Sequence, residues 1–165
     1  MVKWFLHLSM FTILMVSISF SQATTSDLGK VEDMKNPVYG IGLSAGWASG
    51  IGVSFRVHLP SKSSLQVVMG IIKTSSKLSS CLGGEYQYDF TRNKSMRLFL
   101  DAAIGYYYKG VNSNEVAGPF RIGAGVGSEF HVQEAFHVTI AGLFVFFSDG
   151  RIIPLPQISA HYYFY

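Results

Sequence analysis

Apolar residues alternate with polar or small ones, two residues apart, along the chain from position 38 onward. A period of two is the side-chain period of a β-strand, and no stretch of this region keeps the three- and four-residue apolar spacing of an amphipathic helix. Clusters of turn-forming residues divide the pattern into eight segments. The sequence therefore predicts an all-β protein with strands over 38–48, 51–59, 65–74, 80–90, 96–109, 119–131, 136–147 and 155–165.

These segments are apolar enough to belong in a membrane. The chain is 48% hydrophobic and only 14% charged, which departs from an average soluble domain. No segment after position 38 approaches the length of a membrane-spanning helix, so only a closed barrel could cross a bilayer. About ten residues at roughly 3.3 Å each, tilted by about 40°, span roughly 25 Å, the height of an outer-membrane hydrophobic band. We therefore expect an eight-stranded antiparallel up-and-down transmembrane β-barrel.

The alternation separates two chemically different faces. Within 51–59, one face carries Val53 and Phe55 and the other carries Ser54 and Arg56. A soluble barrel turns its apolar face inward and a membrane barrel turns it to lipid, and the alternation alone leaves both orientations open. Aromatic positions favour the membrane, because Tyr and Trp prefer the headgroup level and the aromatics fall near strand ends. We expect two girdles, with Trp47, Tyr106, Tyr108, Phe120 and Phe146 at one rim and Tyr39, Tyr88, Phe90, Phe130, Phe136 and Tyr162 at the other.

The first residues have the pattern of an export signal. A positive start with Lys3, an apolar run over 4–20 and small residues at Ser21 and Ala23 predict a signal peptide over 1–23 that is removed. The alternative is a retained membrane anchor, since the apolar run approaches spanning length. Residues 24–37 are charged and lack apolar periodicity, which predicts a flexible periplasmic segment before a barrel over 38–165.

Connection lengths then set an expected orientation. If strand 38–48 rises from the periplasm, the short polar connections at 60–64, 91–95 and 132–135 are periplasmic turns. The longest connection, 110–118, and the loop at 148–153 then face outward, as is usual for outer-membrane barrels.

The last six residues of the chain, 160–165, are AHYYFY. With the eight alternating segments, this ending resembles the small eight-stranded outer-membrane proteins of the OmpA/OmpX type, over about 38–165. The resemblance implies location in a bacterial outer membrane and recognition of Tyr163 and Tyr165 as an assembly signal. Ile158 departs from the usual polar residue there, and the sequence leaves open which face of this strand meets lipid. The partners implied are outer-membrane lipid, lipopolysaccharide, periplasmic chaperones and the barrel assembly machinery.

Charged residues on the polar face are expected to fill the interior. Eight strands enclose only enough room for side chains, so these groups should pair with one another and leave no open channel. A narrow conduit is the alternative. The interior set is Arg56, His58, Glu85, Gln87, Asp89, Arg97, Asp101, Arg121, Glu129 and His131.

Neither catalysis nor metal binding is expected from the sequence. Ser159 and His161 share a strand face and could form a nucleophile and its base if a carboxylate oriented the imidazole, as in a lipid-modifying enzyme. A serine and a histidine two positions apart are, however, common by chance. His131 and His137 are six apart, which lacks the short spacing of a metal site. No catalytic residue, metal or cofactor is therefore predicted.

The expected function is that of a non-enzymatic, monomeric outer-membrane barrel with an envelope-structural, adhesion or surface-interaction role. The candidate contact residues are Asn112, Asn114, Glu115 and Arg151, in the two outward loops. Removal of the signal peptide takes away Lys3 and lowers the formal net charge of the chain from +3 to +2. So small a positive charge does not indicate nucleic-acid binding. The alternatives are a lipid-modifying enzyme and a soluble exported barrel that binds an apolar ligand.

Overall fold

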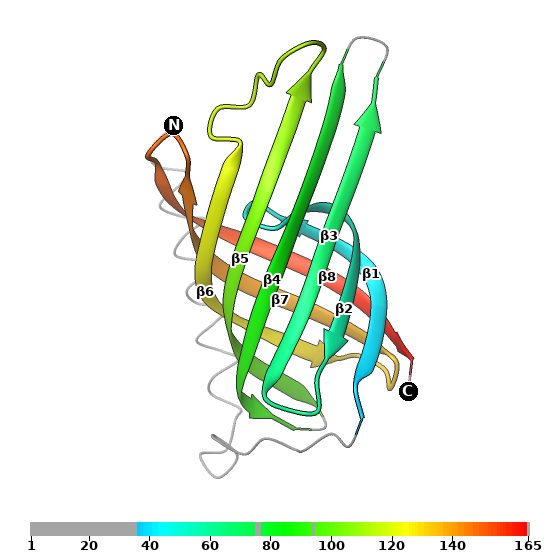
Figure 1. Cartoon of the computed structure of the whole chain (residues 1–165). Helices are drawn as coiled ribbons and strands as arrows, with labels where there is room; N and C mark the ends of the chain where they lie inside the picture. Colours follow the sequence, from blue (N-terminus) through cyan, green and yellow to red (C-terminus); the bar gives the residue numbers. More distant parts are fainter. Residues whose placement is uncertain (1–35, 75–76, 94, 165) are drawn as a thin grey trace, which may run out of the picture.

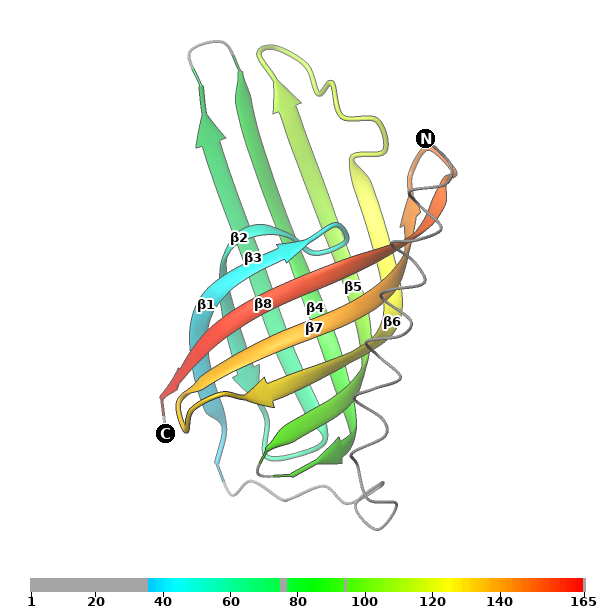
Figure 2. The same ribbon diagram turned by 180° about the vertical axis from the view of Figure 1, so that it is seen from behind.

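A computed structural model of the chain describes residues 36–74, 77–93 and 95–164. Eight antiparallel strands form one closed barrel in sequence order, because β8 pairs with β1 (Figures 1 and 2). The predicted eight-stranded up-and-down barrel is confirmed. Among the described residues, no helix is long and apolar enough to cross a membrane. The strands are β1 (Val38–Gly46), β2 (Gly50–His58), β3 (Ser63–Lys73), β4 (Leu78–Arg92), β5 (Met96–Gly110), β6 (Phe120–His131), β7 (Phe136–Phe147) and β8 (Ile152–Phe164).

The predicted signal peptide and almost all of the segment over 24–37 lie outside the described residues. In the barrel, several predicted strand boundaries differ from the observed ones by two residues, and the start of β8 differs by three. The first strand was expected to reach Ala48, but β1 ends at Gly46 because 47–49 form a turn. The last strand was expected to begin at Leu155, but β8 begins at Ile152 and includes Pro154 and Pro156.

Strand lengths differ around the wall, so one end of the barrel is uneven. Pairing of β2 with β3 stops at Val53 and Met69, whereas β3 and β4 stay paired as far as Lys73 and Leu78. In Figure 1, β3, β4 and β5 rise well beyond the turn that joins β1 and β2. We call this end, with the β1–β2, β3–β4, β5–β6 and β7–β8 connections, the loop end. The opposite end, with the three remaining connections, is the turn end.

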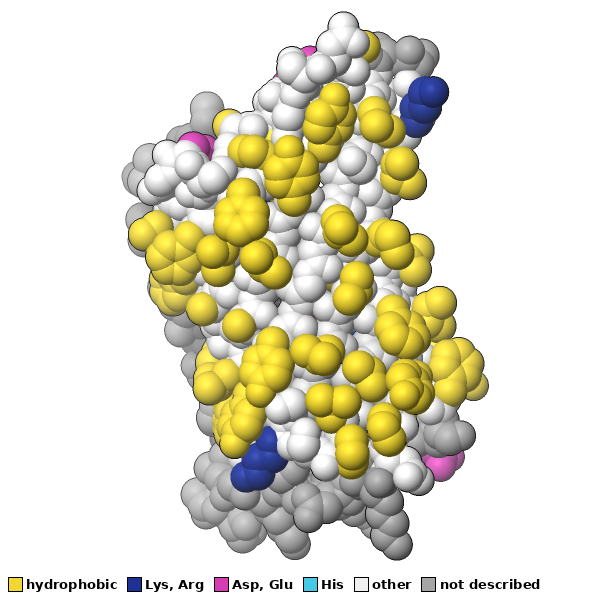
Figure 3. Space-filling model, viewed as in Figure 1, with side chains coloured by type: hydrophobic (Ala, Val, Ile, Leu, Met, Phe, Trp, Pro, Cys, Tyr) yellow, Lys and Arg dark blue, Asp and Glu magenta, His cyan; other side chains and the backbone are white. Residues whose placement is uncertain are grey.

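The outer wall of the barrel is apolar and the charged side chains lie inside. Val53, Phe55 and Ile122 are 54%, 50% and 48% exposed, whereas Arg56 and Glu129 are 0% and 1% exposed. Hydrophobic side chains cover the wall visible in Figure 3, and the charged side chains seen there lie at its two ends. This arrangement is the inverse of a soluble barrel, whose polar face meets water, and is that of a barrel surrounded by lipid.

The β1–β2 turn folds into the barrel mouth at the loop end. Ala48 and Ser49 in this turn are 1% and 0% exposed. The turn runs against two glycines of the opposite wall: a Cβ on Gly105 would lie 2.1 Å from the Ala48 carbonyl oxygen, and one on Gly83 would lie 1.8 Å from that of Ser49. Only glycine leaves room for backbone at this distance. The short connection after β1 is therefore a plug held by the barrel wall.

Candidate functional site

The interior of the barrel contains the main cluster of polar side chains. Eight of the charged or imidazole side chains that the sequence predicted for the interior are buried: Arg56, His58, Glu85, Asp89, Arg97, Asp101, Arg121 and Glu129. Gln87 is buried as well, and His131 is half-buried at the end of β6. The alternation therefore identified the interior face of β2, β4, β5 and β6.

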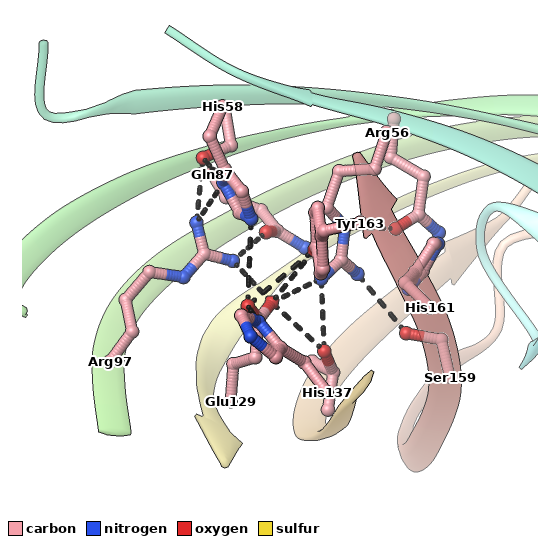
Figure 4. A network of polar contacts seen from close by, with 12 residues as sticks. Arg56, His58, Gln87, Arg97, Glu129, His137, Ser159, His161 and Tyr163 are labelled. Carbon is pink, nitrogen blue, oxygen red and sulfur yellow. Dashed lines mark hydrogen bonds and ion pairs between the residues drawn. The ribbon is translucent and has the colours of Figure 1, made fainter. Parts of the chain in front are cut away.

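Arg56 and Glu129 form the centre of this network (Figure 4). The Arg56 guanidinium, on β2, pairs with Oε2 of Glu129, on β6. The same guanidinium donates to Oε1 of Gln66 at 2.7 Å, and to Oγ1 of Thr139 and Oγ of Ser159 at 2.9 and 3.0 Å. One buried arginine therefore connects strands from several sides of the barrel, and its charge is compensated where it lies.

A second group of ion pairs lies on the β4–β5 side of this centre. Arg97 donates through Nη2 to Oε2 of Glu129 at 3.0 Å, and its Nη1 lies 3.2 Å from Oδ1 of Asp89. Asp89 also pairs with Arg92. Nη1 of Arg97 additionally donates to Ser64 Oγ at 2.6 Å. The charged groups thus form one connected chain, as expected for ions that are removed from water.

Amide side chains surround the next carboxylate toward the loop end. Gln66 and Gln157 both donate to Oε1 of Glu85, at 3.1 and 2.5 Å, and Gln87 donates to Oε2 at 3.1 Å. The carboxylate of Asp101 is also buried, and neither of its oxygens has a hydrogen-bond partner among the described residues. Glu85 is therefore held by neutral donors, whereas Asp101 is the least satisfied carboxylate of the interior.

Apolar side chains fill the interior above this polar layer. Ala48 of the inward turn packs with residues of β5 and β7 in a buried cluster: Ala48, Ala103, Ala141, Leu143, Val145 and Phe147. Arg121 lies at the mouth, where its guanidinium carbon is 3.8 Å from the centroid of the Tyr107 ring and 4.8 Å from that of Phe147. Arg121 also donates to the Trp47 carbonyl oxygen at 3.1 Å. This cation–π stack fastens the plug to β5, β6 and β7.

The Ser159 and His161 pair has no catalytic arrangement in this structure. Ser159 Oγ accepts a hydrogen bond from Arg56, and His161 Nε2 lies 2.7 Å from the hydroxyl of Ser54 on β2. Both side chains are almost fully buried in the barrel interior. Their contacts are those of packed core groups.

The last strand turns one aromatic inward and its neighbours outward. Tyr163 is 1% exposed and receives a hydrogen bond from Nη1 of Arg56 at 3.3 Å, while Tyr162 and Phe164 are more than half exposed. Tyr162 and Phe164 therefore face the outside of the barrel, and Tyr163 belongs to the interior network. Tyr165, the other residue of the predicted assembly signal, lies outside the described residues.

The residues expected in the aromatic girdles lie on the outward face of the strands, except that Trp47, which is 48% exposed, lies in the β1–β2 turn. Trp47 is in the inward turn, with Arg121 5.9 Å from its ring centroid. Most of the others are exposed or half-exposed along the outer wall: Tyr39, Tyr88, Phe90, Tyr106, Tyr108, Phe120, Phe130, Phe136 and Phe146.

Several interior residues were missed by the sequence analysis. They are polar side chains on the inward faces of β3, β7 and β8; His137, Ser159, His161 and Tyr163 were considered for other roles, and the rest were not considered. The same two-residue alternation identifies them once the inward phase of each strand is known. They are Ser64, Gln66, His137, Thr139, Gln157, Ser159, His161 and Tyr163.

The loop end carries an ordered β5–β6 connection. Asn114 is half-buried, donates to the Tyr107 carbonyl oxygen at 2.7 Å, and accepts from the backbone N–H groups of Lys109 and Val116 at 3.1 Å. Lys77, beside the β3–β4 tip, reaches Glu115 at 2.5 Å. Asn112, Glu115 and Arg151 are exposed as expected, but Asn114 is a structural residue of the loop.

These features define a transmembrane β-barrel: a closed antiparallel sheet with an apolar outer wall and a charged, internally paired interior. No family model matches the sequence, and no curated protein matches it. Among solved structures, the chain is similar to outer membrane protein W of E. coli, determined by NMR, with 13% sequence identity and a TM-score of 0.44. The match covers 81% of this chain and 100% of the other.

Proposed function

We propose that this chain is a monomeric, non-enzymatic protein of the bacterial outer membrane that does not conduct and that presents its loop end for surface interaction. This proposal rests on the observation that side chains fill the barrel interior in two successive layers. The network around Arg56 and Glu129 fills the half toward the turn end, and the plug at Ala48 with its apolar neighbours fills the half toward the loop end.

The loop end supports the surface role. Asn114 and the Lys77–Glu115 pair hold the β5–β6 connection in one arrangement, which lowers the entropy cost of binding a partner. The long β3, β4 and β5 strands carry this connection away from the barrel body (Figure 2). On this proposal the loop end faces outward, the turn end faces the periplasm, and lipid and lipopolysaccharide surround the wall.

A lipid-modifying activity is not supported by these contacts. Ser159 and His161 are engaged with Arg56 and Ser54 inside the barrel, away from the lipid-facing wall. Incubation of the purified protein with phospholipid and lipid A should leave both unchanged. Release of fatty acid that Ser159→Ala abolishes would contradict the non-enzymatic proposal.

Two measurements test conduction and orientation. In planar bilayers the folded protein should give no stepwise conductance, and regular channel openings would overturn the closed-barrel proposal. An epitope inserted after Ser113, in the β5–β6 connection, should bind antibody on intact cells, whereas the same epitope after Ser61, at the turn end, should bind only after the outer membrane is permeabilised. The reverse result would invert the proposed orientation.

The surface role is tested by a variant in which residues 112–116 are replaced by two glycines. We expect this variant to restore the detergent resistance of a deletion strain as well as the full chain does, but to lose attachment of the cells to a surface that the full chain supports. Unchanged attachment would count against the loop as the contact site, and loss of detergent resistance would assign the loop to envelope integrity instead.

A further inference from the structure

Three metal-ligating side chains meet at the turn end of the barrel, where β6 turns into β7. The antiparallel register places His131 directly opposite His137. Their rings are stacked, with centroids 4.0 Å apart and planes 16° apart. Candidate ligand atoms of Glu129, His131 and His137 all lie within 4.8 Å of one another. We propose that these three residues bind a divalent metal ion of borderline softness, such as Zn²⁺.

The two carboxylate oxygens of Glu129 have different neighbours, apart from the Tyr163 hydroxyl, which lies 3.5 Å from both. Oε2 receives Arg56, Arg97 at 3.0 Å and the Thr139 hydroxyl at 3.2 Å. Oε1 faces imidazoles: it lies 2.9 Å from Nδ1 of His137 and 3.5 Å from Nε2 of His58. The guanidinium groups therefore fix the orientation of the carboxylate through one oxygen and leave the other directed at the histidines, as outer contacts do for metal ligands.

His137 has oxygen neighbours at both ring nitrogens. Nδ1 faces Glu129 Oε1, and Nε2 lies 3.3 Å from the Glu134 carbonyl oxygen. A neutral imidazole carries one N–H. Without a metal, a hydrogen on Nδ1 donates to Glu129 Oε1 at 2.9 Å; when a cation takes that place, the hydrogen lies on Nε2 and donates to the Glu134 carbonyl oxygen. A cation between Nδ1 and Oε1 completes this arrangement, and a backbone carbonyl on the second nitrogen is a usual partner of a metal-bound histidine.

Binding of a tetrahedral ion requires a small rearrangement. Two ligand atoms bound at about 2.05 Å to a tetrahedral zinc lie about 3.3 Å apart, so Nδ1 of His137 and Oε1 of Glu129, now 2.9 Å apart, must separate by a few tenths of an ångström. One of the two stacked imidazole rings must also turn so that both direct a nitrogen at the ion. Two imidazoles and one carboxylate form a donor set that zinc accepts, with the fourth position left for water. His131 is half-buried at the last position of β6, so an ion can enter from the turn end.

Isothermal titration of the tag-free chain over 24–165, folded in detergent, with ZnCl₂ tests the site. We expect one ion per chain, a rise in the unfolding temperature with zinc, and binding weakened at least about tenfold in His131→Gln and in His137→Gln. The matched control is His161→Gln, because His161 is an interior histidine whose Nε2 lies against Ser54 outside the cluster; its zinc affinity should equal that of the wild type.

Replacement of zinc by Co²⁺ gives a second readout that does not depend on stability, since a tetrahedral cobalt site absorbs strongly in the visible range. The proposal is overturned if the wild-type barrel binds no stoichiometric zinc, if both His131→Gln and His137→Gln bind as tightly as the wild type, or if His161→Gln weakens binding equally. Folded variants are identified by their mobility on a gel when the sample is not boiled, and only these variants are used to decide between the outcomes.

Discussion

Arg56 and Glu129 form an ion pair across the barrel, between β2 and β6, which are four strands apart in a closed ring of eight. Neither side chain is exposed beyond 1%. The pair therefore connects opposite walls through the interior, and the stability of the barrel should depend on it more than on any charge at the surface.

Loss of one partner of this pair should be strongly destabilising. Arg56→Met leaves Glu129 with an uncompensated part of its charge in the interior, which costs about 3–5 kcal/mol of unfolding free energy. The double variant Arg56→Met/Glu129→Gln should lose less than the sum of the two single variants, because the remaining charge is removed as well. Urea unfolding of the folded barrel in lipid vesicles measures both effects.

The surface pair of Asp149 and Arg151 serves as the control. Arg151→Gln should leave the unfolding midpoint in urea unchanged, since exposed ion pairs contribute little. An equal effect of Arg56→Met and Arg151→Gln would contradict the role of the interior network.

The plug should be sensitive to the size of residue 105. Gly105→Ala places a Cβ 2.1 Å from the Ala48 carbonyl oxygen, so the turn must move outward. We expect a lower unfolding midpoint and a red-shifted emission of Trp47, which lies in this turn and is the only tryptophan outside the predicted signal peptide. Gly142→Ala is the matched control, because a Cβ there meets nothing within 4 Å; a similar response of both variants would argue against the plug.

A charge on the outer wall should be costly, while the same change in a loop should not. Val53→Arg puts a guanidinium against lipid and should destabilise the barrel by about 2–4 kcal/mol if position 53 lies near the bilayer midplane. Val111→Arg is the control, because Val111 is the same residue type in the β5–β6 connection. Its side chain is 65% exposed, against 54% for Val53. Unfolding in vesicles should distinguish them, and equal midpoints would be inconsistent with a lipid-facing Val53.

The loop pair gives a pH prediction outside the membrane. The hydrogen bond from Arg151 Nε to Asp149, 2.9 Å long, lowers the pKa of the Asp149 carboxyl below its ordinary value. Because the folded-state pKa is the lower one, the contribution of the pair is present above the ordinary pKa of aspartate and is lost as the pH falls through the lowered pKa. NMR titration of Asp149 should show this, and Arg151→Gln should return the midpoint to the ordinary value; an unchanged midpoint would refute the pairing.

The strands were predictable from the sequence because lipid and a narrow interior impose opposite requirements on alternate residues. Val53 and Arg56 could not exchange faces without placing a charge in lipid, so the alternation is strict in β2. The start of β8 was placed three residues too late, directly after Pro154, because proline argues against a strand. Both positions pair with β7, but β1 pairs with β8 only as far as Ala45 and Ile158, so the prolines lie where the β1 side of β8 is unpaired.

Contacts between strands distant in sequence could not be predicted in the same way. His131 and His137 looked too far apart for a shared site, although a turn centred near position 134 places them opposite each other. The inward fold of the β1–β2 turn depends on Gly83 and Gly105, which lie on two other strands. Such contacts depend on register and on which side chains leave space, and one sequence does not specify either.

The most direct test of the account is quenching of tryptophan fluorescence by lipids with brominated acyl chains, in a Trp47→Phe background. Phe55→Trp and Phe99→Trp make the same substitution at positions 50% and 0% exposed. We expect strong quenching of the tryptophan at position 55 and weak quenching of that at position 99. Stronger quenching at position 99 than at position 55 would mean that the apolar face of the strands points inward, and would contradict a membrane-spanning barrel.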